Sequence, residues 1–184
     1  NCTQMGVCQI VVWTGREIIV WGGDPYIAPS SGGRYNPVSD SCSPTSTCAN
    51  VPINDYLNTA IWTGTEMVVW GGCCTYNTGG RYNPATNTWL QTFIGFNTPS
   101  PRQSHTAIWT GAEMIVWGGD NGNYYLNTGG RYVRSTDSWQ AMSMGINNPV
   151  ESYRHTGVWA GTGMVIWCGD NGTYLNCAGR NNPS

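Results

Sequence analysis

Short apolar runs alternate with polar, glycine-containing turns four times along the chain. Each unit has a first apolar run ending in Trp, a Thr-Gly or Ala-Gly turn, and an unbroken second run that ends in a second Trp. A period of 47 to 50 residues separates the units. Such a period, with glycine directly after a β-rich run, predicts a repeated supersecondary unit, typically a four-stranded propeller blade. The four copies read WTGREIIVWGG, WTGTEMVVWGG, WTGAEMIVWGG and WAGTGMVIWCG, and their first Trp residues are Trp13, Trp62, Trp109 and Trp159.

The hydrophobic pattern within one unit predicts strands and no helix. In the third unit, residues 105–109 are short, apolar and β-branched, and residues 114–117 form an unbroken apolar run. Such a run is typical of a strand that is covered on both faces. A third strand begins at Arg131 and Tyr132, and an Asn-Pro turn such as Asn83-Pro84 precedes a fourth strand.

Length variation is confined to one loop in each unit. The last glycine of a GGR or AGR sequence lies 12, 10, 13 and 12 residues after the second Trp, whereas the distance from the first three of these glycines to the next first Trp is always 29 residues. Loops that vary on a constant scaffold usually carry binding surfaces. Their tyrosines, accompanied by Asn, either stack on sugar rings or protein surfaces or simply cover the rim of the blades. These residues are Tyr26, Tyr76, Tyr124, Tyr125 and Tyr174.

The repeated positions resemble the kelch repeat of β-propellers. The marks of that repeat are a hydrophobic strand ending in Gly-Gly, a Tyr at a fixed distance beyond it and a Trp about six residues after the Tyr. The second and third units match it with Trp70-Gly71-Gly72, Tyr82 and Trp89, and with Trp117-Gly118-Gly119, Tyr132 and Trp139. The resemblance covers essentially the whole chain. The departures are Cys42 at the position of the later Trp in the first unit, and Cys168, Ala178 and Asn181 in the fourth.

We therefore expect an all-β fold, a β-propeller with four kelch-like blades in a single domain spanning residues 1–184. The repeats are assigned to residues 1–49, 50–96, 97–146 and 147–184. The innermost strand of each blade is expected to begin at Gln9, Asn58, His105 or His155.

The two ends of the chain predict an incomplete fourth blade. Without gaps, Asn1 aligns with Asn50, Asn97 and Asn147, so the chain starts at a repeat boundary. Five residues follow Gly179 and twelve precede Trp13, whereas 28 residues separate the corresponding glycine from the next first Trp inside the chain. Eleven residues are therefore missing, and they correspond to residues 86–96. The fourth blade should lack its outer strand and leave an unpaired edge near residues Ala178 to Asn182. Either a neighbouring subunit completes that edge by strand addition, or the chain is a fragment of a longer propeller.

Composition and charge exclude some classes of partner. The chain has 25 Gly, 10 Trp and 10 Tyr but only 10% charged residues, and its formal net charge is −2. It therefore offers no basic field for phosphate groups, and nucleic-acid binding is not expected. No apolar run approaches the length of about 18 residues that a membrane-spanning helix needs.

Eight cysteines without metal-ligand spacing indicate disulfides, and hence an oxidising compartment and a secreted protein. We expect Cys42 to pair with Cys48 and Cys168 with Cys177. Cys2 and Cys8 form another plausible local pair, whereas the adjacent Cys73 and Cys74 either bond to each other or to separate partners. Asn1 and Asn171 begin potential N-glycosylation sequons.

Three groups of polar residues recur at fixed places and allow a functional or a structural interpretation. The repeated Arg and Glu residues are expected to form structural ion pairs. A ring of Gln9, Asn58, His105 and His155 should line one end of a central channel. Its two imidazoles suit a metal, but hydrogen-bonded turn residues are favoured, and no metal or other cofactor is expected. The Asp residues that follow the glycines are expected to form turns rather than cation loops. The ion-pair group comprises Arg34, Arg81, Arg131 and Arg180 with Glu17, Glu66 and Glu113. The turn group comprises Asp24, Asp120 and Asp170.

The sequence thus predicts a secreted, non-enzymatic propeller that acts as a binding or assembly module, through protein or glycan contacts of its variable loops. One alternative is a structural subunit of an extracellular filament or other homopolymer. A further alternative, which the kelch resemblance brings in, is a copper radical oxidase. That chemistry needs converging Tyr and His ligands and a Cys cross-linked to one Tyr, whereas both His residues lie at equivalent repeat positions.

Overall fold

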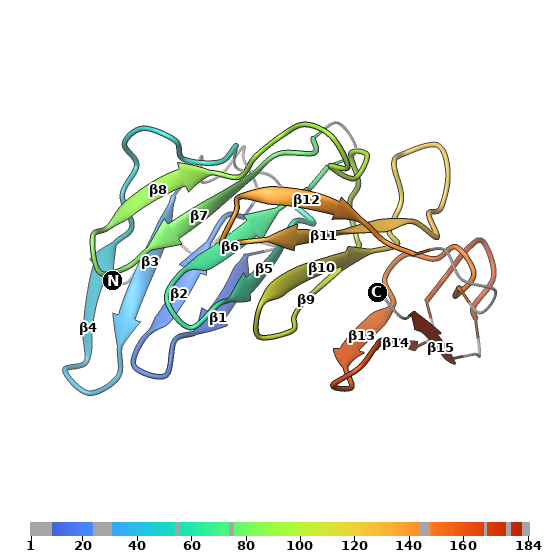
Figure 1. Ribbon diagram of the computed structural model, residues 1–184. Helices are drawn as coiled ribbons and strands as arrows, with labels where there is room; N and C mark the ends of the chain where they lie inside the picture. Colours follow the sequence, from blue (N-terminus) through green and yellow to red (C-terminus); the bar gives the residue numbers. More distant parts are fainter. Residues whose placement is uncertain are drawn as a thin grey trace.

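A computed structural model of the chain contains only β-strands, arranged as four antiparallel sheets that fan out side by side (Figure 1). It describes residues 9–23, 31–53, 56–73, 76–143, 148–167, 169–175 and 178–181. Within these residues no helix is long and apolar enough to cross a membrane. The all-β prediction is confirmed.

Each sheet is one blade, and its strands follow one another in chain order. Blade 1 comprises β1 (Ile10–Trp13), β2 (Ile18–Trp21), β3 (Gly32–Asn36) and β4 (Ser41–Pro44). Blade 2 comprises β5 (Thr59–Trp62), β6 (Met67–Trp70), β7 (Gly79–Asn83) and β8 (Thr88–Gln91). Blade 3 comprises β9 (Thr106–Trp109), β10 (Glu113–Trp117), β11 (Gly129–Val133) and β12 (Ser138–Ala141). Blade 4 comprises β13 (Thr156–Trp159), β14 (Met164–Trp167) and β15 (Ala178–Asn181).

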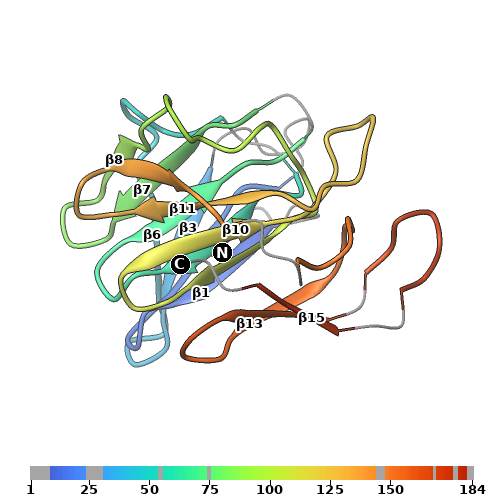
Figure 2. The same cartoon turned by 45° about the vertical axis from the view of Figure 1, so that its right-hand side comes forward.

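The first strand of each blade lies innermost, as the sequence predicts. β1 packs on β5, β5 on β9 and β9 on β13, so the blades are arranged around a common axis. Residues of the four inner strands line a central cavity of about 380 Å³ that is open on one side. The turned view in Figure 2 shows β13 and β15 set beside the strands of the other blades.

The fourth blade ends at its third strand, which confirms that prediction among the described residues. β15 pairs with β14 in the register Met164↔Asn181 to Trp167↔Ala178. In blades 2 and 3 the corresponding strands β7 and β11 also pair with an outer strand, for example through Tyr82↔Trp89. The described part of blade 4 has no such strand, and its sheet is three-stranded.

Successive blades share one apolar core at each interface. One face of blade 1, with Val12, Ile19 and Trp21, packs against Met67 and Val69 and the outer aromatic residues of blade 2. The other two interfaces repeat this arrangement one blade further on. Because a strand alternates its side chains between two faces, each unbroken apolar run serves two interfaces at once.

Aromatic side chains join the outer parts of neighbouring blades by ring contacts and by hydrogen bonds to backbone carbonyls. The Trp89 ring lies 4.5 Å from that of Trp21, between centroids, and the Trp139 ring lies 5.1 Å from that of Trp70. Each outer Trp also donates through its indole nitrogen to a carbonyl of the preceding blade, at 3.2 Å for Trp89 and 3.1 Å for Trp139. Each outer Trp also lies against the Tyr of its own blade, at 5.0 Å for Tyr82–Trp89 and 5.3 Å for Tyr132–Trp139 between centroids. The outer Trp of the kelch pattern therefore connects neighbouring blades as well as strands of one blade.

Arg102 is a fully buried cation in the segment that leads into blade 3. Its guanidinium donates to the carbonyls of Ser100, Gly118 and Thr128 at 3.0, 3.1 and 2.6 Å. It also donates to the hydroxyls of Ser100 and Thr128. Burial lowers the pKa of Arg102 to about 10, so the group stays charged at neutral pH. This side chain ties the segment before β9 to the loop after β10.

We expect Arg102→Met to destabilise the protein by about 3 kcal/mol, because it leaves buried carbonyls without donors. Arg16→Met, at an exposed turn position, is the control and should change the free energy of unfolding by less than about 0.5 kcal/mol. Urea unfolding followed by tryptophan fluorescence measures both values. Equal effects of the two substitutions would contradict the structural role of Arg102.

Candidate functional site

The repeated Arg and Glu residues form ion pairs inside the blades, which confirms their structural interpretation. Arg34 donates to both carboxylate oxygens of Glu17, at 3.0 and 2.9 Å. Arg131 lies 3.4 Å from Glu113. In blade 4, where Gly163 replaces the Glu, Arg180 donates to the Thr162 hydroxyl at 2.6 Å.

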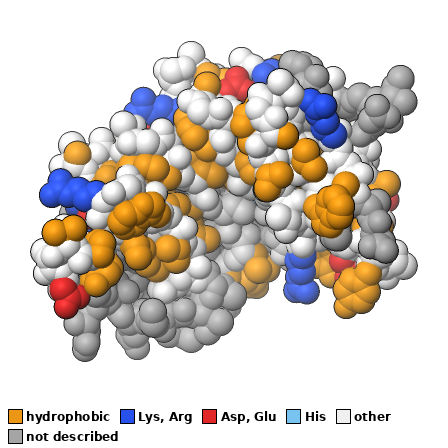
Figure 3. Space-filling model, turned by 90° about the horizontal axis from the view of Figure 1, so that it is seen from below, with side chains coloured by type: hydrophobic (Ala, Val, Ile, Leu, Met, Phe, Trp, Pro, Cys, Tyr) orange, Lys and Arg blue, Asp and Glu red, His pale blue; other side chains and the backbone are white. Residues whose placement is uncertain are grey.

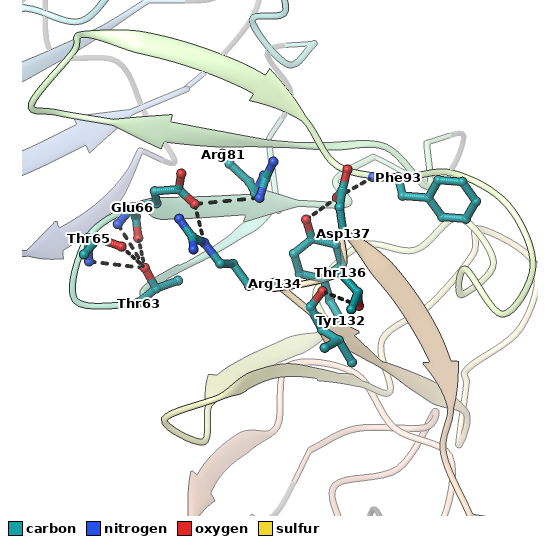
Figure 4. A network of polar contacts seen from close by, with 10 residues as sticks. Thr63, Thr65, Glu66, Arg81, Phe93, Tyr132, Arg134, Thr136 and Asp137 are labelled. Carbon is teal, nitrogen blue, oxygen red and sulfur yellow. Dashed lines mark hydrogen bonds and ion pairs between the residues drawn. The ribbon is translucent and has the colours of Figure 1, made fainter.

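Glu66 connects two blades as well as two strands (Figure 4). It lies 4.0 Å from Arg81 of its own blade and accepts a hydrogen bond of 2.9 Å from Arg134 of blade 3. On the same β11–β12 turn, Asp137 accepts a hydrogen bond from the Tyr132 hydroxyl and another, of 3.0 Å, from the Phe93 amide of blade 2. These charges hold neighbouring blades together.

The predicted ring places three of its four members on the central cavity. Asn58, His105 and His155 line it and are nearly fully buried, whereas Gln9 is half-buried and is not among the lining residues. The imidazole of His105 shares a hydrogen bond of 2.8 Å with the Thr59 hydroxyl of blade 2. Among the residues that the structure describes, no three His, Cys, Asp or Glu side chains come together as a metal site.

Each histidine packs on the second tryptophan of the preceding blade. The His105 ring meets Trp70 edge-on at 5.3 Å and the His155 ring meets Trp117 at 4.9 Å. The glycine after each Trp makes room for the imidazole, because a Cβ on Gly71 would lie 2.6 Å from the His105 ring. Gly71 also has a φ of +70°, a conformation that other residues resist. The Gly-Gly sequence is thus needed for blade packing at the cavity.

Burial keeps both histidines neutral. Desolvation, followed by the charge of Arg102, lowers the pKa of His105 to about 3, and desolvation lowers that of His155 to about 4. Neutral imidazoles without a carboxylate partner do not form a general acid–base pair near neutral pH. The central cavity is therefore lined by two neutral imidazoles.

The variable loop of the third repeat lines a second cavity, of about 320 Å³, between blades 3 and 4. We call it the loop site, and it is lined by Gln103, Asp120, Gly122, Asn123, Tyr124, Tyr125 and Tyr153. The loop that follows β10 and the segment that leads into β13 lie at the same end of the blades, because the strands alternate in direction. The site is therefore built by two neighbouring repeats.

Two stacked tyrosines form one wall of the loop site. The rings of Tyr125 and Tyr153 are 5.0 Å apart between centroids and 8° from parallel. The Arg154 guanidinium carbon lies 5.1 Å from the centre of the Tyr153 ring. Burial, followed by the charge of Asp170, raises the pKa of Tyr153, so its hydroxyl remains a donor at neutral pH. Tyr124, beside this stack, is 74% exposed.

Asp120 provides a fixed negative charge in the loop site. Its carboxylate accepts hydrogen bonds of 3.1 Å from the Gln103 amide and from the Gly122 backbone N–H. The equivalent Asp170 of blade 4 accepts a bond of 2.7 Å from Gly172. Both residues close short turns, which confirms the turn interpretation over a cation loop; Asp24 lies outside the described residues.

The other loop tyrosines are distributed over the rim. Tyr174 is 93% exposed on blade 4, Tyr76 is half-buried on blade 2, and Tyr26 lies outside the described residues. Sequence reasoning missed Gln103, Tyr153 and Arg154. Gln103 lies two residues before His105, and Tyr153 and Arg154 lie two residues and one residue before His155. That position, at the same end of the blades as the variable loops, is the signal that could have identified them.

The expected disulfide between Cys42 and Cys48 is wrong. Cys42 is disulfide-bonded, but Cys48 has a free and exposed thiol. Cys42 lies in β4, which continues extended to Pro44 and so carries the chain away before the turn that holds Cys48. The Sγ of Cys73 donates to the Tyr56 hydroxyl at 3.4 Å. The remaining candidates, Cys2, Cys8, Cys74, Cys168 and Cys177, lie outside the described residues, as does Asn1. Asn171 lies in the exposed loop of blade 4, where it accepts a hydrogen bond of 3.1 Å from Thr173.

Comparison with known proteins agrees with this architecture. The family model described as the KLHDC2/KLHL20/DRC7 Kelch-repeats domain matches residues 8–179, which is nearly the whole chain and extends into the last strand of blade 4. A search of curated proteins finds no match.

The buried histidines predict a loss of stability in mild acid. Their pKa values are lower in the folded than in the unfolded protein, where they are about 6.5. Their contribution is therefore fully present above pH 6.5 and is lost as the pH falls from 6.5 towards about 4, because the unfolded chain binds protons that the folded one does not. We expect on the order of 2 kcal/mol per histidine by about pH 4.5.

The variant His105→Asn/His155→Asn takes the residue that blade 2 uses at the same position and is expected to be less sensitive to acid over this range. Urea unfolding at a series of pH values provides the comparison. An unchanged slope of stability against pH would show that other groups account for the acid sensitivity.

Proposed function

Because this chain belongs to the kelch-repeat family, we propose that it is a protein-binding β-propeller module whose contact surface is the loop site. The observation that carries this proposal is the stacked pair of Tyr125 and Tyr153, which comes from two different blades and is open to solvent beside Tyr124. Aromatic residues and arginine are the side chains that most often dominate the energy of protein interfaces.

The surroundings of the stack suit a polypeptide ligand. Asp120 offers a carboxylate, Gln103 and Asn123 offer amides, and Arg154 adds a cation at the edge. A peptide side chain can lie against the tyrosine rings while its backbone bonds to the amides. Because hydrogen bonds already orient Asp120 and Gln103, little ordering is needed on binding. Sugars share part of this chemistry, so the glycan hypothesis is tested in parallel.

A peptide display library and a glycan array, each screened with the whole protein, test the assignment. We expect peptide ligands whose affinity falls about 30-fold in Tyr125→Ala and in Tyr153→Ala, corresponding to about 2 kcal/mol for an aromatic hot spot. The control is Tyr76→Ala, a loop tyrosine of blade 2 outside the site, which should bind as the parent protein does. Peptides that bind all variants equally, or ligands found only among the glycans, would contradict the proposal.

The proposal includes secretion and a non-enzymatic role. The disulfide at Cys42 supports an oxidising compartment, where such bonds persist. The engagement of the repeated Arg and Glu residues in structural pairs, and of the histidines in packing, supports binding rather than catalysis. The filament alternative rests on one feature, the β15 edge of the three-stranded blade, where a further strand could pair in self-association.

The β15 edge is tested with a peptide of residues 135–142, which supplies the outer strand in blade 3. We expect the labelled peptide to bind the protein in fluorescence anisotropy and a scrambled peptide of the same composition not to bind, because only the native order places the Trp139 side chain on the correct face. Equal binding of the two peptides would remove the support for strand addition.

A further inference from the structure

The last blade has an apolar face that no other blade covers. Trp167 is 59% exposed, whereas the equivalent Trp21, Trp70 and Trp117 of the other blades are completely buried. Val158 of the same face is 55% exposed, although its equivalents Val12, Ile61 and Ile108 are all buried. In blades 1 to 3 this is the forward face, the one that packs against the following blade.

The first blade has the opposite face uncovered. Val11 and Trp13 are 59% and 52% exposed on β1. Tyr35 is only half-buried, whereas the equivalent Tyr82 and Tyr132 are completely buried against the preceding blade. In blades 2 to 4 this is the rear face, which receives the forward face of the blade before it.

The two open faces are the halves of an interface that the molecule already makes three times. Each internal interface joins a forward face bearing a buried Trp to a rear face bearing a first-strand Trp and apolar residues of the second strand. Trp167 and Val158 supply the first half, and Trp13, Ile18 and Val20 supply the second. The halves therefore match in chemistry and in the spacing of their side chains.

The polar contacts beside the cavity follow the same rule. The Thr59 hydroxyl of blade 2 shares a hydrogen bond of 2.8 Å with the His105 imidazole of blade 3, and the Thr106 hydroxyl of blade 3 donates one of 3.1 Å to the backbone carbonyl of His155 in blade 4. Thr156, the equivalent in blade 4, is exposed, and Gln9 occupies the histidine position in blade 1. A Thr156–Gln9 contact would complete the series.

The chain does not join these faces to each other. β1 packs on β5, β5 on β9 and β9 on β13, but β13 makes no comparable packing with β1. From these observations we infer that a second copy of the chain closes the ring, with the forward face of blade 4 in each copy packed on the rear face of blade 1 in the other. Two copies give eight blades and two identical contacts related by a two-fold axis, within the usual range of propeller sizes.

The surface composition fits such an association. Seen from below, hydrophobic side chains form several separate groups, with mostly uncharged surface between them (Figure 3). The interface would differ from the internal ones in its outer part, because Cys42 takes the position of Trp89 and Trp139. The contact therefore depends on the inner two strands of each blade, where Trp13 and Trp167 lie. It uses neither the loop site nor the β15 edge.

Sedimentation velocity of the whole chain tests the inference. All proteins carry Cys48→Ser, so that the exposed thiol cannot link two copies. We expect the parent to sediment at twice the 20.0 kDa mass of the chain at micromolar concentration, and Trp13→Glu and Trp167→Glu to be monomers with self-association weakened at least tenfold. Val38→Glu, at a fully exposed turn position outside both faces, is the matched control and should remain dimeric.

Mixing the two Trp variants gives the decisive result. Trp13→Glu keeps an intact blade 4 face and Trp167→Glu an intact blade 1 face, so the mixture should regain dimers joined by a single interface, although each variant alone is monomeric. Circular dichroism of each variant confirms that it is folded. A monomeric parent, a dimer that survives either Trp substitution, open-ended polymers, or a mixture that stays monomeric would each overturn the inference.

Discussion

The structure depends on the packing of one blade face against the next. The second strand of each repeat has apolar side chains on both of its faces. A single blade cannot bury both faces unless another blade packs on each side. The burial of Trp21, Trp70 and Trp117 against the following blade measures how completely this requirement is met. The same requirement explains the outer Trp residues, the Gly-Gly sequences and the histidines, because each fits a part of one blade against a part of another.

This packing leaves the loops as the place where the surface is free to vary. The Arg–Glu pairs, Arg102 and the polar bonds between blades fix the positions of the strand ends, so that short loops can be held close together without a core of their own. Tyr125 and Tyr153 stack because blade packing brings the loop of one repeat beside the entry segment of the next. The loop site is thus a consequence of the blade order, and it would not exist in an isolated repeat.

The sequence predicted the blades well because four copies reveal which positions are constrained. The strand order, the innermost strands and the missing outer strand of blade 4 all follow from the spacing of Trp and Gly. The loop site was only half predicted: Tyr124 and Tyr125 belong to a variable loop, but Tyr153 lies in a stretch of constant length, and only its position in space connects the two. The Cys42–Cys48 pair was wrong for a similar reason, since separation along the chain does not reveal that an extended strand lies between them.

Repetition also distinguishes structural from functional residues in this fold. A group that recurs in three blades, such as the pairs of Arg34 with Glu17 and of Arg131 with Glu113, meets a structural requirement of the repeat, and it is paired within its own blade. A side chain that occurs in only one repeat meets a requirement of that one position. Arg102 supplies hydrogen bonds that one loop requires, whereas Arg154 is exposed and its guanidinium lies over the Tyr153 ring. The exposure of Trp167 is informative for the same reason, because the residue is constant while its burial is not. A constant side chain in a changed environment indicates the surface that we infer to contact a second copy, whereas the singular Arg154 lies at the edge of the separate loop site.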